Sequence, residues 1–169
     1  MNICESIKTF DINNIFYLDP IKNTVIDNSN FIRILYSNQS FSLNGIYIVL
    51  KFKNIQKIFQ NNKVKILFDL NNSNNLTNIN FIKKLEHDLL KNCIINNKKP
   101  YTKLRDQINQ GCLKNSINVY IDNKNEVIIN SEEDYILKIS GIWESEIEYG
   151  LTYKILDTQN LLSIGSKKF

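Results

Sequence analysis

The stretch ILKISGIWESEIEYGLTYKIL, residues 136–156, decides the fold because it is the clearest strand–turn–strand unit in the chain. Before the turn, positions 136, 138, 140 and 142 alternate with 137, 139, 141 and 143, and Trp143 is the chain's single tryptophan. After the turn, the odd positions from Tyr149 to Ile155 alternate with the even ones from Gly150 to Leu156. Period-two alternation rich in β-branched and aromatic residues is typical of a half-buried hairpin. Such a hairpin either closes an ordinary sheet or offers an aromatic, lysine-bearing surface.

Composition predicts one globular domain. The chain has 169 residues, of which 43% are hydrophobic and 22% charged, enough to bury a core. It contains 27 Asn, 28 Ile and no Ala, which indicates an AT-rich genome, such as that of a parasite, an AT-rich bacterium or a large DNA virus. No run is long enough to span a bilayer, and the first residues lack the features of a signal peptide. We therefore expect an intracellular protein that is not secreted and has no membrane partner.

Motifs for catalysis or metal binding are scarce. Three widely spaced cysteines and a lone histidine, His87, argue against a disulfide framework and a zinc site. No phosphate-binding glycine loop or nucleophile elbow occurs. The alternating Glu144, Glu146 and Glu148 could hold a divalent cation, but a soluble acidic turn is the commoner explanation, and 132–134 is interpreted in the same way. We expect no enzyme activity, no cofactor and no metal; an enzyme with a metal at Glu144 and Glu148 is the remote alternative.

The order of elements favours a mainly β fold with one principal helix. We expect strands at 31–37, 46–53 and 64–70, a loop at 71–78, a helix from 79 to about 96 and a short helix at 103–110. Short strands at 117–121 and 127–129, joined by a turn at 122–125, then lead to the hairpin. This is the order of an OB-fold, a five-stranded Greek-key barrel with its helix between strands three and four. Here residues 1–30 form an N-terminal extension packed on a single OB-like domain, 31–169, with an extra hairpin; a β-sandwich with a peripheral helix is the alternative.

Charge is concentrated in the middle of the chain. Residues 51–114 carry a net charge of +9, between flanks of −1 and −4, a distribution suited to an anionic partner or to a solvated lysine-rich surface. Single-stranded nucleic acid needs a basic groove and aromatic rings on which bases stack. In an OB-fold, strands two and three and the neighbouring loops form that surface. Alternation turns Tyr47, Lys51, Lys53 and Lys65 outward, with Phe41 in the first loop and Lys57 and Lys63 in the connection between the strands.

The segment 139–156 also resembles the closing hairpin of phage-type OB-fold single-stranded DNA-binding proteins of nucleocytoplasmic large DNA viruses. The elements that match are Gly141-Ile142-Trp143 before the turn and 150–154, GLTYK, after it. The resemblance implies a role in viral DNA replication, recombination or repair, in the host cytoplasm (the viral factory) or the virion. It adds Trp143, Tyr153 and Lys154 to the candidate nucleic-acid-binding residues.

Two features depart from the family pattern. Members usually end in an acidic tail tipped by an aromatic residue, whereas Lys167 and Lys168 precede Phe169 here. The loop 144–148 is acidic where an OB-fold would approach phosphates. The sequence therefore predicts non-enzymatic, sequence-tolerant binding of single-stranded DNA, with replication proteins as further candidate partners. The alternative is a virion or protein-interaction module with no nucleic-acid role.

Overall fold

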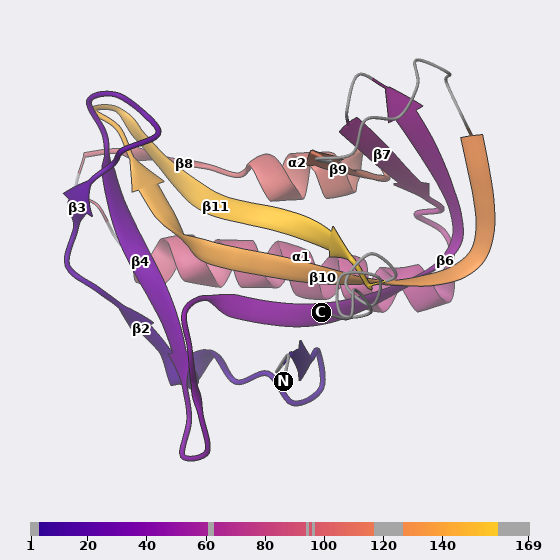
Figure 1. Cartoon of the computed structure of the whole chain (residues 1–169), viewed down its shortest axis with the longest axis horizontal. Helices are drawn as coiled ribbons and strands as arrows, with labels where there is room; N and C mark the ends of the chain where they lie inside the picture. The colour runs from indigo at the N-terminus through magenta and orange to yellow at the C-terminus, as the bar shows by residue number, and fades with distance from the viewer. Residues whose placement is uncertain (1–3, 61–62, 94, 96, 117–126, 159–169) are drawn as a thin grey trace, which may run out of the picture.

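A curved, largely antiparallel sheet forms most of the protein, which confirms the predicted mainly β fold with a principal helix (Figure 1). The computed structural model describes residues 4–60, 63–93, 95, 97–116 and 127–158. No helix within these ranges is long and apolar enough to cross a membrane. The longer elements are β4 (Asn30–Ser37), β6 (Ile46–Gln60), β7 (Lys63–Phe68), α1 (Ser73–Asn92), α2 (Lys103–Asn109), β9 (Cys112–Ser116), β10 (Val127–Glu144) and β11 (Glu148–Asp157). The shorter ones are β1 (Glu5–Ser6), the 3-10 turn η1 (Ile12–Asn14), β2 (Ile15–Tyr17), β3 (Ile21–Lys22), β5 (Ser42–Leu43) and β8 (Lys99–Tyr101).

The long strand β10 organises the sheet. One edge pairs first with β6 and then, near its end, with β4, while the other edge pairs with β11. β11 and β10 form the antiparallel hairpin predicted from residues 136–156. β7 continues the sheet beyond β6, and β9 pairs with β7. α1 passes behind β10 in Figure 1, and α2, drawn above β11, also contacts that strand. The helices therefore cover one face of the sheet, and the opposite face is turned toward the viewer.

The core fills the space between the sheet and the helices. Ile48 and Leu50 on β6 pair with Leu137 and Tyr135 on β10, and all four are at most 1% exposed. Residues at positions 82, 85 and 89 of α1 pack against them from the helix side. The recurrence of apolar residues at every second strand position and every third or fourth helix position produces this two-layer core.

β6 is longer than predicted and is bent at Asn54. The backbone φ of Asn54 is +53°, a left-handed conformation that asparagine tolerates better than most residues. The buried positions shift there from Phe52 to Ile55, and the strand continues to Gln60 instead of ending at Lys53. In Figure 1, β6 and β10 curve together beyond this point. The prediction that Lys57 lies in a connection between strands was wrong. The alternation of β6 shifts at the bend, so the sequence pattern suggested that the strand ends there.

α1 begins at Ser73, so the prediction of a loop over residues 71–78 was wrong. The side chain of Asn72 caps the helix by accepting a hydrogen bond from the backbone N–H of Asn74 at 3.0 Å. Asn75 is fully buried, and its amide accepts from the N–H of Lys53 at 2.9 Å and donates to the Lys53 carbonyl at 3.0 Å. Polar residues therefore face the sheet here because they satisfy backbone groups beside the bend in β6.

Other boundaries differ as well. β9 was not predicted, and the strand and turn expected at 117–125 lie outside the described residues. The predicted strand 127–129 is the start of β10, which runs without interruption to Glu144. The acidic run 132–134 is therefore part of a strand and not of a turn. Its three carboxylates face lysines of β6. Short strands of the N-terminal residues, β2 and β3, pair with β4.

A buried carboxylate joins the two helices. Glu86 of α1 is 1% exposed and accepts hydrogen bonds from the backbone N–H groups of Leu104 at 3.1 Å and Arg105 at 2.7 Å. These donors lie in the first turn of α2, whose cap residue Thr102 supplies no side-chain hydrogen bond. Burial raises the pKa of Glu86 above its ordinary 4.5, against the opposing effect of the two backbone donors.

We expect Gly141→Ala to destabilise the protein. A Cβ at Gly141 would lie 2.3 Å from the Ile32 carbonyl oxygen and 2.6 Å from Cζ of Phe31, so the two strands would have to separate. The expected loss in the free energy of unfolding is about 1–3 kcal/mol, measured by urea denaturation. Ser140→Ala, at the partly exposed neighbouring position, should change stability much less. Equal stabilities of the two variants would contradict this packing.

The raised pKa of Glu86 predicts a pH-dependent difference between wild type and Glu86→Gln. A carboxyl whose pKa is higher in the folded state contributes most below its unfolded pKa, and the contribution is lost as pH rises through the folded value. The stability of wild type minus that of Glu86→Gln should therefore fall as pH increases above about 4.5. Urea denaturation of both proteins at pH 4 to 8 measures this difference, and a difference that rises with pH would contradict the assignment.

Candidate nucleic-acid interface

The side of the sheet opposite the helices carries three rows of cross-strand neighbours. Residues paired across neighbouring strands share a face, so each row follows from the register. One row crosses β4, β10, β11 and β8, the next crosses β4, β10 and β11, and the third crosses β6, β10 and β11. We call this surface the open face; its rows are Phe31–Trp143–Gly150–Tyr101, Arg33–Gly141–Thr152 and Tyr47–Lys138–Lys154.

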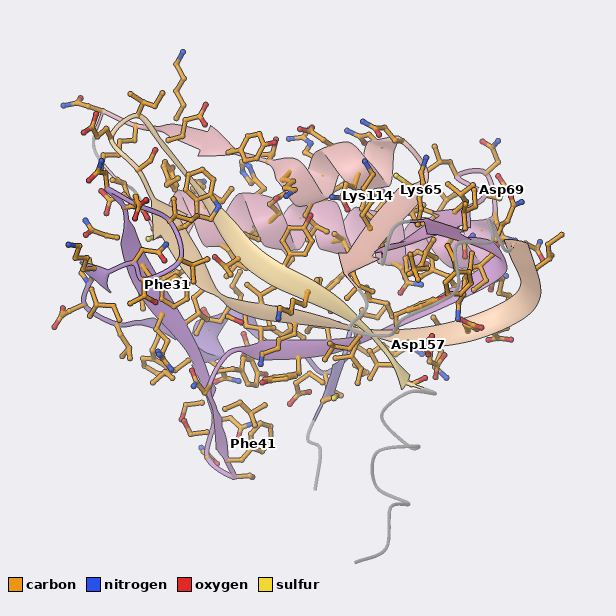
Figure 2. All side chains as sticks on the ribbon, turned by 45° about the horizontal axis from the view of Figure 1, so that its top comes forward. Phe31, Phe41, Lys65, Asp69, Lys114 and Asp157 are labelled. Atoms are coloured by element: carbon orange, nitrogen blue, oxygen red, sulfur yellow. The ribbon has the colours of Figure 1, made fainter. Side chains whose placement is uncertain are left out.

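The first row is aromatic. Trp143 lies over Gly150, where an added Cβ would be 3.1 Å from Cζ2 and Nε1 of the indole. Tyr101 meets Trp143 edge-on, with ring centroids 6.1 Å apart and an interplanar angle of 61°. Phe31 covers Gly141 in the same way, and Figure 2 marks its position on β4. The two glycines leave room for the rings, which remain partly exposed.

The other two rows are basic. The Nζ of Lys138 lies 5.2 Å from the centroid of the Tyr47 ring, and Lys154 is exposed beside it. Within the described part of the chain, no carboxylate lies within 4.0 Å of the charged groups of Arg33, Lys138 or Lys154. The open face thus combines partly exposed aromatic rings with cations that have no ion-pair partner among the described residues.

Lys51 and Lys53 extend the open face along β6, as the alternation predicted. Lys51 lies 3.5 Å from Asp134, and Lys53 lies 3.7 Å from Glu132. Side chains of these pairs are 37–65% exposed, and such surface ion pairs contribute about 0–1 kcal/mol. An anionic ligand could therefore compete for either lysine at little cost in stability.

Lys57 does not lie on the surface. Its side chain is 8% exposed and contacts the carboxylate of Glu133, which is 4% exposed, while Nζ donates to Oδ2 of Asp157 at 2.9 Å. The ring of Tyr135 lies 5.5 Å from the same Nζ. Burial opposes the charge on Lys57, but hydrogen bonds to the two carboxylates outweigh it and raise its pKa. Its assignment to the nucleic-acid surface was wrong, since the bend at Asn54 turns it inward.

Tyr153 and Phe41 were also placed differently from the prediction. Tyr153 pairs with the buried Ile139 on the helix-covered face, and its hydroxyl is buried with no hydrogen-bond partner among the described residues. Burial raises its pKa. Phe41 packs partly buried against Tyr36, with centroids 6.2 Å apart, at the far end of β4 and β5 (Figure 2). Neither ring belongs to the open face.

The predicted lysines of β7 lie away from the open face. Lys63 begins β7, and Lys65 is exposed opposite Ile58, beyond the bend in β6. β7 pairs with residues 55–60 and not with the part of β6 that carries Tyr47. The structure therefore separates Lys65 from the surface on which the sequence had grouped it.

The acidic turn is partly neutralised. Glu144 accepts from Nζ of Lys98 at 2.5 Å, and the same Nζ donates to the Ser145 carbonyl at 2.7 Å. Glu146 is exposed at the tip. Across the described ranges, no group of three His, Cys, Asp or Glu residues assembles that could hold a metal ion.

Sequence reasoning missed Phe31, Arg33 and Lys138. Lys138 lies in the hairpin itself, on the same face as Lys154, and its alternation could have identified it. Phe31 and Arg33 required the pairing of β4 with the end of β10. The periodicity of the strand at 31–37 gives the face of each residue but not its neighbouring strand.

Comparisons with known proteins do not assign the chain to a family. No protein-family model and no solved structure matches the chain. A curated relative, the tRNA(Ile)-lysidine synthase of Mycoplasma mycoides subsp. mycoides, is 32% identical over 124 residues. This match covers 72% of the chain but 30% of the synthase. The chain therefore spans less than a third of the length of that relative.

Replacement of Lys57 should be far more damaging than replacement of Lys53. Lys57→Ala leaves the buried Glu133 carboxylate without this ammonium, which is expected to lower the free energy of unfolding by about 3–5 kcal/mol. Lys53→Ala removes an exposed pair and should cost less than about 1 kcal/mol. Thermal and urea denaturation measure both, and similar losses for the two variants would refute the buried pair.

Proposed function

We propose that the protein is a non-enzymatic, sequence-tolerant single-stranded DNA-binding protein and that the strand lies on the open face. The observation that carries this proposal is the aromatic row at Trp143 beside the basic rows at Arg33, Lys138 and Lys154, all on the side of the sheet without helices. Single-strand binding uses these two kinds of side chain together.

The aromatic row and the two basic rows would hold different parts of the bound strand. Bases stack on the aromatic row, where each stacked base contributes about 1–3 kcal/mol. Phosphates contact Arg33, Lys138 and Lys154, so affinity falls with salt by a slope of about 0.7 in log units for each contact to a single strand. Stacking and phosphate contacts do not distinguish one base from another, which accounts for sequence tolerance. The ring of Tyr47 adds a further surface once its neighbour Lys138 turns toward a phosphate.

We also propose that the sheet is an OB-like barrel. α1 follows β7, the third long strand, as the helix does in the OB order. β9, at one end of the strand order, also lies against β11 at the other side of the sheet. The bend of β6 at Asn54 turns β7 and β9 back over the core, which supports the closeness of β9 to β11.

The biological setting follows from composition and from the resemblance of the hairpin. An AT-rich large DNA virus that replicates its genome in the host cytoplasm needs proteins that hold exposed single strands, and replication proteins would be partners. The relative named for a tRNA makes RNA an informative competitor. If the open face instead serves a virion or protein-interaction role, oligonucleotides will not bind it.

Lys138→Ala/Lys154→Ala should weaken binding to oligo-dT and lower the salt slope by about 1.4, because two phosphate contacts are lost. The fluorescence of Trp143 and the anisotropy of a labelled oligonucleotide of about 8 nucleotides, within the site size of an OB-fold, measure this. Lys84→Ala/Lys91→Ala removes the same charge from exposed positions of α1 and should leave binding nearly unchanged.

Three outcomes would contradict the proposal: no binding by wild type at low salt, equal losses in the two double variants, or a preference for duplex DNA. Oligo-rU of the same length, measured in parallel, tests the choice of DNA over RNA. Stronger binding to oligo-rU would reject DNA as the ligand while retaining the open face as a single-strand surface.

A further inference from the structure

Two lysines lie directly opposite each other on β7 and β9. Lys65 and Lys114 are cross-strand partners, and both are exposed. Figure 2 shows the two side chains close together at the end of the molecule where Asp69 lies. No carboxylate of the described residues is within 4.0 Å of either ammonium group. Like charges in direct opposition destabilise a sheet, so this pair lowers stability unless an anion binds between them.

Within the described residues, the surroundings of this pair are basic on balance, and β7, α2 and β9 expose no aromatic side chain there. α2 leads directly into β9 and exposes Lys103 and Arg105 beside Asp106, and Asp69 is exposed just after β7, so cations outnumber carboxylates here. The single aromatic residue of β7, α2 and β9 is Phe68, which is 6% exposed. Much of the basic middle of the sequence thus lies here and on α1, away from the open face. Such a surface suits phosphates, and its described residues offer no exposed ring on which bases could stack.

β6 connects this pair to the open face. Lys65 pairs with Ile58, which is seven residues beyond Lys51 on the same strand. Seven extended residues span about 23 Å, and the bend at Asn54 shortens the direct path. A strand that leaves the open face past Lys51 and Lys53 therefore meets Lys65 and Lys114 next.

We propose that Lys65 and Lys114 form a second phosphate contact for the same single strand, one that only longer strands reach. This inference rests on the proposed function and adds that the protein guides DNA around the bent end of the sheet. The first contact holds bases and phosphates, whereas the second holds the backbone alone. The pair therefore contributes affinity and salt dependence without contributing base preference.

The test compares Lys65→Gln/Lys114→Gln with wild type on oligo-dT of about 8 and about 30 nucleotides, lengths within and above the OB-fold site size of about 4–16. Affinity for the short oligonucleotide should not change. Affinity for the long one should fall more than about tenfold at 50 mM salt, with a salt slope lower by about 1.4. Lys84→Gln/Lys91→Gln, on α1, should leave both affinities unchanged.

Removal of the opposed charges should also raise the melting temperature, by about 1–3 °C, so the variant remains folded. Unchanged affinity of the variant for long oligonucleotides, while wild type binds both lengths, would overturn the inference and leave the proposed function intact. Absence of short-oligonucleotide binding by wild type would overturn the proposed function itself. A lower melting temperature, or preferential binding of an acidic peptide such as poly-Glu by wild type over oligo-dT, would also overturn the inference.

Discussion

The register of β10 against its neighbours is the constraint on which the rest of the structure depends. β10 pairs with β6 and β4 on one edge and with β11 on the other, so its alternation sets the face of residues on four strands. A shift of one residue would carry Leu137 and Ile139 to solvent and Lys138 into the core. Because Leu137 and Ile139 are fully buried, the hydrophobic core fixes this register and thereby the composition of the open face.

The bend in β6 gives the sheet its second important property. Up to Phe52 the strand supports the open face, and beyond Asn54 the same strand turns Lys57 into a buried cluster with Glu133 and Asp157. The helix residue Asn75 holds the backbone of Lys53 at this point. Polar side chains, rather than apolar ones, thus determine where the sheet curves and which lysines remain available to a ligand.

The local pattern of apolar and polar residues was sufficient to predict several elements of this structure. The hairpin over residues 136–156, the short helix at 103–110 and the outward positions of Tyr47, Lys51 and Lys53 agree with the predictions. Predictions failed where a polar residue takes a structural role. In an Asn-rich sequence, the helix cap Asn72 and the buried Asn75, which hydrogen-bonds the backbone, resemble loop residues. Composition carries no information about the hydrogen-bond partner of a side chain.

The sequence by itself determined the mainly β character, the principal helix and the presence of the hairpin, because these depend on periodicity over a few residues. The predicted alternation failed beyond Ile139, where a register shift before Gly141 places Ile142 with the buried residues and Trp143 on the open face. Only the tertiary structure decided that Phe31 and Arg33 lie beside Trp143 and Gly141, that Lys57 is buried and that Lys65 opposes Lys114. Those relations join residues 49 to 112 positions apart in the chain. They are set by strand pairing and by the bend at Asn54, which a local pattern does not encode.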